Sequence, residues 1–134
     1  MKGVNSFEIR LRNAEGIPIV EIGGELTKTA LRAVEFTLEK LASAGHFNVV
    51  VNVEKAQAAN WGFLSGLADV IRKFRSHYGA VDLVAAQDRI QQLVRIEQLS
   101  RLFRFSRSEG QAISRIKGLS RQPDGITDTN ARLA

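Results

Sequence analysis

The chain has 134 residues, of which 44% are hydrophobic and 25% charged, and it contains no cysteine. This size and composition are ordinary for one domain with its own hydrophobic core. The lack of cysteine excludes disulfides, thiolate metal sites and cysteine nucleophiles. No run approaches the roughly 18 apolar residues of a membrane span, and the N-terminal residues lack the apolar core of a signal peptide. We therefore expect a cytoplasmic protein without membrane insertion.

The net charge of +5 is unevenly distributed. Residues 61–134 carry 12 basic and 7 acidic side chains, whereas residues 1–60 carry 7 of each. Such a basic half attracts acidic protein surfaces or phosphates. The alternative is that these side chains form only a solvated basic face.

The first elements follow a two-residue period. Phe7, Ile9 and Leu11 alternate with charged residues, which predicts a strand with one buried face. A turn at residues 13–16 leads to a second strand over residues 17–22, which we expect Gly23-Gly24 to end. Apolar residues at helical spacing then predict a helix over residues 27–44 that Gly45 stops.

The middle of the chain predicts a covered strand followed by a helix. Val49-Val50-Val51 is a β-branched run, typical of a strand buried on both faces, and places residues 48–53 at the centre of the sheet. A loop is expected over residues 54–59. Asn60 is a good N-cap for a helix that runs to about Tyr78.

The remaining elements alternate in type. We expect a strand over residues 81–85, a helix over 88–97 with Ile90, Leu93 and Val94 facing inward, and a short strand over 102–105. Ser108 and Gln111 have the spacing of a capping box, which predicts a last helix to about Lys117.

This order predicts an α/β fold with a mixed β-sheet of four to five strands and helices packed against it. A single domain is expected over residues 1–119. Residues 120–134 offer little to bury and are expected to form a disordered tail.

Motifs of catalysis and cofactor binding are missing from the sequence. There is no Walker loop, no dinucleotide-binding glycine motif and no serine-hydrolase elbow. His46 and His77 have no metal-ligand spacing. We expect a protein that is not an enzyme and has no cofactor and no metal.

Several segments resemble the STAS domain family, which includes anti-sigma factor antagonists and stressosome proteins. Gly24-Glu25-Leu26-Thr27 resembles the family's G-E-L-D, and Val49-Val50-Val51-Asn52-Val53 resembles its central L-V-L-D-L strand. Leu99-Ser100-Arg101-Leu102-Phe103 resembles its G-L-x-x-L-F stretch, with Gln98 in place of the glycine. The resemblance spans residues 7–119 and implies the STAS fold.

The family's phosphorylation signature, D-S-S-G-L-G, is degenerate here. Aligned without gaps, it falls on Asn60-Trp61-Gly62-Phe63-Leu64-Ser65, so Gly62 stands where the family phosphorylates a serine. Gly62 has no hydroxyl, and the usual switch cannot operate there. A competing register would make Ser65 a displaced phosphosite.

The same helix predicts a docking surface. At 100° per residue, Leu64, Leu67, Val70, Ile71 and Phe74 face the core, whereas small or charged residues face away. Trp61 falls off the core direction, either as an anchor for a partner or as a lid over the preceding loop. The candidate partner-binding residues are Asn60, Trp61, Gly62, Ser65, Gly66 and Asp69.

The resemblance implies a non-catalytic signalling module. Its expected partner is an ATP-binding serine kinase that acts as an anti-sigma factor, a stressosome component or another STAS protein, and a homodimer stays open. One alternative is the small STAS subunit of an ABC lipid transporter. Another is a nucleic-acid-binding domain, which would use the basic residues Arg72, Lys73, Arg75, Arg101, Arg104, Arg107, Arg115 and Lys117. No recognition motif accompanies these residues.

Overall fold

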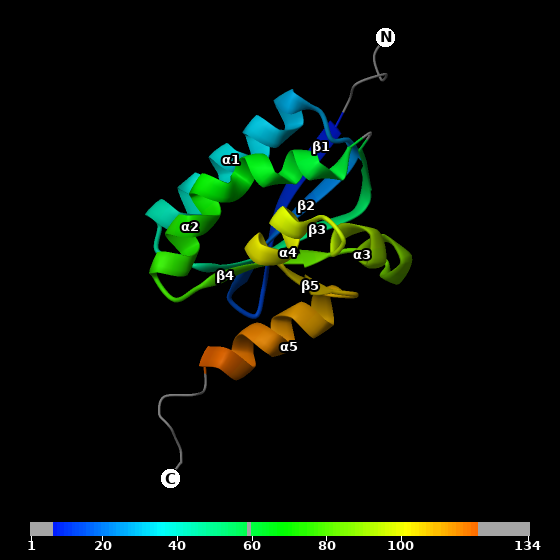
Figure 1. Ribbon diagram of the computed structural model, residues 1–134. Coiled ribbons are helices and arrows are strands. Elements are labelled where there is room, and N and C mark those ends of the chain that lie inside the picture. The colour runs from blue at the N-terminus through cyan, green and yellow to red at the C-terminus, as the bar shows by residue number, and fades with distance from the viewer. Residues whose placement is uncertain (1–6, 59, 121–134) are drawn as a thin grey trace.

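A five-stranded sheet in the order β1-β2-β3-β4-β5 organises the molecule (Figure 1). The structure, a computed structural model, describes residues 7–58 and 60–120. β1 pairs antiparallel with β2, and the other neighbours are parallel. The strands are β1 (Phe7–Ala14), β2 (Ile17–Glu25), β3 (Asn48–Gln57), β4 (Ala80–Val84) and β5 (Arg104–Ser106). The predicted mixed α/β fold is confirmed.

Helices cover both faces of the sheet. α1 (Lys28–Ser43), the 3₁₀ helix η1 (Trp61–Leu67) and α2 (Ala68–Ser76) lie on one face, and α5 (Glu109–Ser120) lies on the other (Figure 1). α3 (Gln87–Leu93) and α4 (Glu97–Leu102) connect β4 to β5. None of these described helices is long and apolar enough to cross a membrane.

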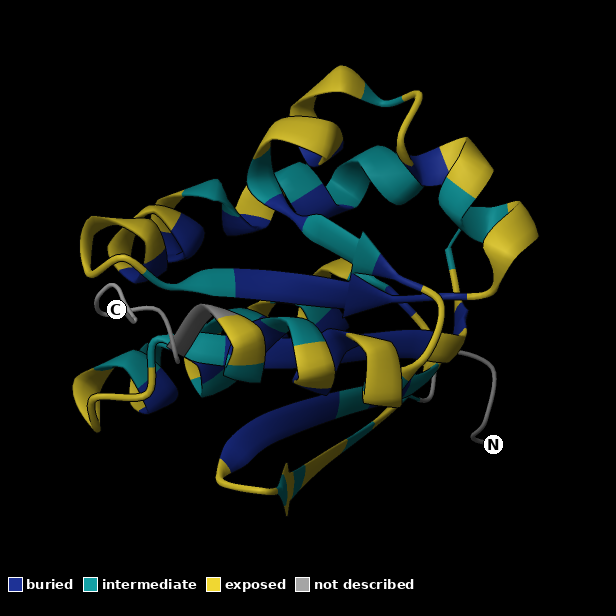
Figure 2. Ribbon diagram, turned by 90° about the horizontal axis from the view of Figure 1, so that it is seen from below, coloured by how far each residue is buried: buried dark blue, intermediate teal, exposed yellow. Residues whose placement is uncertain are grey.

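The valine run of β3 separates two apolar cores. Val49 and Val51 belong to the core under α1 and α2, whereas Val50 belongs to a smaller core with Ile113 and Ile116 of α5. All three valines are completely buried. Figure 2 shows these central strands buried between helices whose outer faces are exposed. The prediction of a doubly covered central strand is confirmed.

Two strands run further than the sequence predicted. β2 continues through Gly23-Gly24, where we expected it to end. β3 continues to Gln57, so the expectation of a loop from residue 54 is wrong up to that residue. Both strands continue because these two segments pair with each other. Gly23 lies opposite Lys55, with a register shift after Glu21. Such a shift bends the ladder and lets it continue.

The predicted helices also differ in detail. The segment after Asn60 begins as the 3₁₀ helix η1 and becomes α-helical only at Ala68, and α2 ends at Ser76 before Tyr78. The helix expected over residues 88–97 is present as α3 but ends at Leu93, and the separate helix α4 that follows was not predicted. Val94 was expected to face inward but is 42% exposed, since α3 ends beside it.

α5 begins as predicted. The backbone N–H of Gln111 donates to the Ser108 hydroxyl at 3.1 Å, which is the capping bond that the spacing implied. The Gln111 side chain instead accepts from the N–H of Arg107. The helix runs to Ser120, three residues beyond the predicted end. The expected tail lies outside the described residues from 121 onward.

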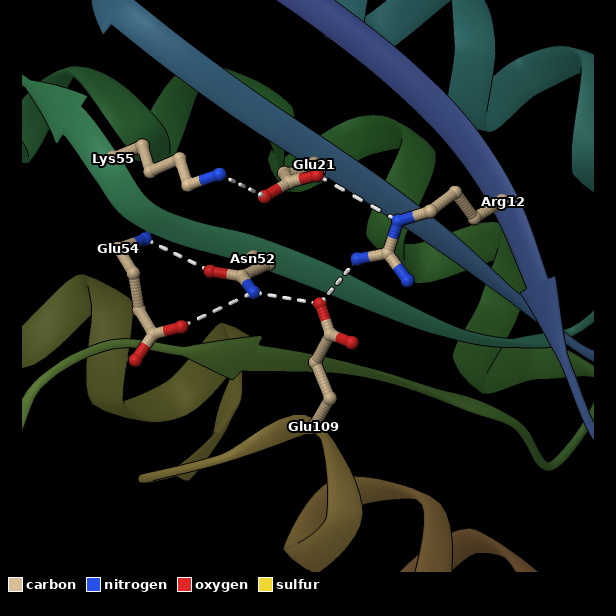
Figure 3. A network of polar contacts seen from close by, with 6 residues as sticks. All are labelled: Arg12, Glu21, Asn52, Glu54, Lys55 and Glu109. Atoms are coloured by element: carbon tan, nitrogen blue, oxygen red, sulfur yellow. Dashed lines mark hydrogen bonds and ion pairs between the residues drawn. The ribbon is translucent and has the colours of Figure 1, made fainter.

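A polar network ties α5 to the sheet (Figure 3). Glu109 Oε2 lies 2.5 Å from Arg12 Nη2 and accepts a hydrogen bond from Asn52 Nδ2 at 2.7 Å. Glu21 lies between Arg12 and Lys55, at 3.6 and 3.4 Å. Burial raises the pKa of Glu109, but the bonds from Arg12 and Asn52 outweigh it and hold the pKa below its ordinary value.

A second charged group is buried under α5. Asp82 in β4 is completely buried, lies opposite Arg104 of β5, and has its Oδ2 at 3.4 Å from Arg115 Nη1. Burial raises the pKa of Asp82, and the two guanidinium groups oppose this effect without cancelling it. Burial likewise lowers the pKa of Arg104. Arg115 therefore pairs with a buried carboxyl group while its own side chain stays 35% exposed.

Candidate functional site

The entry to η1 is organised by Asn60. Its backbone is extended, and its side-chain Oδ1 accepts a hydrogen bond from the N–H of Gly62 at 2.9 Å. This is the N-cap arrangement that the sequence predicted. A Cβ atom at Gly62 would lie 3.1 Å from the same Oδ1, so a side chain there fits only if the cap shifts by a few tenths of an ångström.

Ser65 is committed to a bond within η1. Its hydroxyl donates to the carbonyl of Gly62 at 2.7 Å, and the residue is half-buried. A phosphate on Ser65 would remove this donor. Ser65 as a displaced phosphosite therefore stays a prediction. Gly62 has both of its backbone groups bonded to side chains, its N–H to Asn60 and its carbonyl to Ser65.

Gly66 and Asp69 are exposed on the same stretch of chain. A Cβ atom at Gly66 would lie 3.0 Å from Leu31 Cδ2, so close packing of η1 on α1 already explains a glycine there. Asp69 forms an exposed ion pair with Arg72 at 2.6 Å. One small residue of the predicted surface, Gly66, is therefore explained by packing within the protein, without any partner.

Trp61 lies nearer the core than predicted. It is half-buried and packs against the core, because residues three apart share one face of a 3₁₀ helix and Leu64 and Leu67 are completely buried. The expectation that Trp61 lies off the core direction assumed α-helical spacing and is wrong. Arg89 of α3 lies over the indole at 4.7 Å, and its Nη1 donates to the Ala56 carbonyl at 2.8 Å.

A hollow borders this surface on the side of α4. It has a volume of about 270 Å³ and is lined by Ser65, Ala68, Arg72, Gln98, Arg101 and Leu102. Arg101 is paired with Glu97 at 2.6 Å, as Arg72 is with Asp69. The hollow thus combines the apolar side chains of Ala68 and Leu102 with polar groups and two exposed ion pairs, a mixture suited to a polypeptide surface.

A larger hollow also borders η1, at Phe63. Its volume is about 590 Å³, and it lies where β2 and β3 end and α1 begins. Its lining mixes apolar and charged residues, namely Glu25, Leu26, Thr27, Lys28, Gln57, Ala58 and Phe63. Each hollow thus includes one residue of η1, Ser65 in the smaller and Phe63 in the larger.

The structure brings the six predicted residues together on η1 and the start of α2. It adds Arg89, Gln98, Arg101 and Leu102, which the sequence analysis did not connect with this surface. Their proximity depends on the break between α3 and α4, and no pattern in the sequence marked that break. The described residues contain no cluster of three or more metal-ligating side chains.

The predicted basic patch is largely neutralised. Lys73 pairs with Glu39, Lys117 with Glu15, and Arg115 with the buried Asp82. Arg72 and Arg101 pair with acids on their own helices. This pairing reduces the positive charge that these five residues offer to a phosphate backbone, whereas Arg75, Arg104 and Arg107 form no ion pair with another described residue.

Known proteins share the fold of this chain. The family model of the STAS domain matches residues 8–112. An anti-sigma factor antagonist from Mycobacterium paratuberculosis superposes with a TM-score of 0.71 at 13% identity, over 87% of this chain and 99% of that one. No curated protein matches the chain.

The anti-sigma factor antagonist SpoIIAA is similar in both of its forms. The unphosphorylated form gives a TM-score of 0.61 at 16% identity, over 84% of this chain and 99% of that one. The phosphorylated form, described as a Bacillus cell fate determinant, gives 0.60 at 14% identity, over 83% and 99%. At these identities the likeness establishes the fold.

Proposed function

Because the chain belongs to the STAS domain family, we propose that it is a non-catalytic signalling module that docks onto a protein partner. The docking surface consists of Asn60, Trp61, Gly62, Ser65, Gly66 and Asp69 on η1 and the start of α2. Two hollows beside η1 support this proposal, since Ser65 of this surface lines one of them and Phe63 of η1 lines the other.

The observation that carries the proposal is Gly62. It occupies the first turn of η1, the position that resembles the family's phosphorylated residue, and it has no hydroxyl. Phosphorylation adds a charge of about −2, enough to disrupt a docked interface. A chain that cannot take this charge at Gly62 stays in the uncharged state, and its docking is constitutive at this position.

The proposed partner is an ATP-binding serine kinase of the anti-sigma factor type, a stressosome component or another STAS protein. Such a partner would place the chain in the cytoplasm. Affinity capture with the tagged chain, beside a Trp61→Ala variant, identifies candidates. Capture of a transporter nucleotide-binding subunit would instead favour the lipid-transport alternative.

The test uses the purified kinase, ATP and intact-mass analysis. The wild-type chain is expected to bind the kinase and gain no phosphate, whereas Gly62→Ser gains one. A matched Gly62→Ala variant controls for the Cβ contact with Asn60 and should gain none. Phosphate on Ser65 of the wild type, lost in Ser65→Ala, would contradict the constitutive reading and establish a displaced switch.

A further inference from the structure

β1 presents an open edge of the sheet, since among the described residues it pairs only with β2. Glu15 and Gly16, with φ of 54° and 84°, form a two-residue turn between the paired Ala14 and Ile17. Residues that flank such a turn exchange backbone hydrogen bonds. Counting back from Ala14, even-numbered residues of β1 bond to β2 and odd-numbered residues direct their N–H and C=O outward. Pro18 has no N–H to donate and pairs with the odd-numbered Asn13, which agrees with this assignment, since odd-numbered residues of β1 form no hydrogen bonds with β2.

Several side chains along this edge are exposed and have no partner among the described residues. Leu11 is 56% exposed, although Phe7 and Ile9 on the same face pack partly against the core. On the other face Glu8 and Arg10 are exposed, and neither forms an ion pair with another described residue. An open edge with an exposed leucine and two unpaired opposite charges is a surface suited to strand pairing.

We propose that a second copy of this chain adds its β1 antiparallel to this edge, with the two-fold axis at Ile9. Phe7 of each copy then lies opposite Leu11 of the other, and Glu8 lies opposite Arg10. The sheet becomes continuous across the two copies. This proposal does not depend on the proposed docking function, because it uses a different strand and different residues.

The charge pattern selects this register. The outward-directed groups belong to odd-numbered residues, so a symmetric ladder must be centred on one residue of β1. If the ladder is centred on Arg10 or Glu8, that residue lies opposite the same residue of the other copy, and like charges meet. If it is centred on Leu11, Arg10 lies opposite Arg12 of the other copy. Only the register centred on Ile9 places both charges opposite their complements.

The backbone pattern favours the same register. Ile9 and the two Phe7–Leu11 pairs become hydrogen-bonded pairs and add roughly six ladder bonds. Glu8 and Arg10 fall in the non-hydrogen-bonded pairs, where side chains approach more closely. A ladder this short buries little area, so the association should be weak and dependent on concentration.

Sedimentation of the full chain at micromolar to sub-millimolar concentrations tests the proposal. The wild type is expected to form dimers, and Glu8→Arg or Arg10→Glu alone should weaken dimerisation at least about tenfold, because like charges then meet twice across the axis. The double variant Glu8→Arg/Arg10→Glu should dimerise again. An equimolar mixture of the two single variants should form mixed dimers.

Asp88→Lys serves as the control, since it reverses an exposed charge at the start of α3, outside both β1 and the docking surface, and should leave the dimer intact. Because the chain has no cysteine, Ile9→Cys provides a second readout. It should form an intermolecular disulfide faster than Asp88→Cys on the exposed start of α3. A monomer at all concentrations, or a dimer that both single charge reversals leave unchanged, would overturn the proposal.

Discussion

Gly79 lies where the chain leaves α2 and enters β4. A Cβ atom there would lie 1.7 Å from the Phe47 carbonyl oxygen, which accepts the N–H of Ala80 at 3.0 Å. The backbones of the two segments would have to separate. We expect Gly79→Ala to lower the free energy of unfolding by about 3 kcal/mol, measured by urea denaturation.

Gly118 is the matched control for this substitution. It lies within α5, and a Cβ atom there would meet nothing within 4 Å. Gly118→Ala should therefore stabilise the protein by about 0.5–1 kcal/mol through the higher helix propensity of alanine. If the two substitutions changed the free energy of unfolding equally, the close contact with Phe47 would not be the reason for a glycine at position 79.

Asp82 gives stability a definite dependence on pH. Its raised pKa means that the folded protein holds this proton more tightly than the unfolded chain does. As pH rises above about 4, the unfolded chain ionises first, and the contribution of Asp82 to stability falls until the folded pKa is passed. Relative to Asp82→Asn, the wild type should lose stability over this range, measured by denaturation at a series of pH values.

Glu109 should show the opposite sign in the same experiment. Its lowered pKa means that its contribution is present above about pH 4.3 and is lost as pH falls through the folded-state value. Relative to Glu109→Gln, the wild type should lose stability on acidification. Parallel slopes for the two variants would contradict the assigned environments of these carboxyl groups.

At the scale of elements, η1 depends on its cap. Asn60→Ala removes the acceptor for the Gly62 N–H and should lower the free energy of unfolding by about 1 kcal/mol. Asn60→Ser keeps a side-chain acceptor and should lower it by much less. Thermal denaturation measures both, and equal losses would mean that the cap does not stabilise η1.

The strands and the first helix could be predicted because each shows a clear period. β1 alternates, α1 repeats its apolar residues at helical spacing, and Val49-Val50-Val51 marks a doubly covered strand. The extension of β3 past Glu54 could not be predicted, since Glu54 and Lys55 are exposed and resemble a loop. Pairing with the glycines of β2 decides their structure.

The helical differences have a related cause. An α-helix and a 3₁₀ helix differ by only about 20° per residue, so the burial of Leu64 and Leu67 was predicted correctly under the wrong geometry. Over the three residues between Leu64 and Trp61 the difference in direction adds up to about 60°, and it turns the Trp61 side chain toward the core. Leu93 and Leu99 on either side of the break between α3 and α4 are both buried, and no glycine or proline marks this break in the sequence.

At the scale of the whole molecule, the two faces of the sheet have different roles. The face under α5 holds the buried Asp82 and the network around Glu109, and its basic residues serve the fold. The face under α1 and α2 carries η1 and the two hollows that border it. The sequence proposed the docking residues of η1 and α2 from helical spacing together with the resemblance to the family's signature. It could not identify the flanking residues of α4, because these are brought beside η1 only by the complete fold.

The most direct test of the docking proposal is the affinity of the purified partner for the chain and two charge-reversal variants, measured by titration calorimetry. Asp69→Lys, on the proposed surface, should weaken binding at least about tenfold. Glu15→Lys, in the β1–β2 turn at the other end of the sheet, should leave the affinity unchanged. Equal affinity of the wild type and Asp69→Lys, with both proteins folded, would contradict docking through η1 and α2.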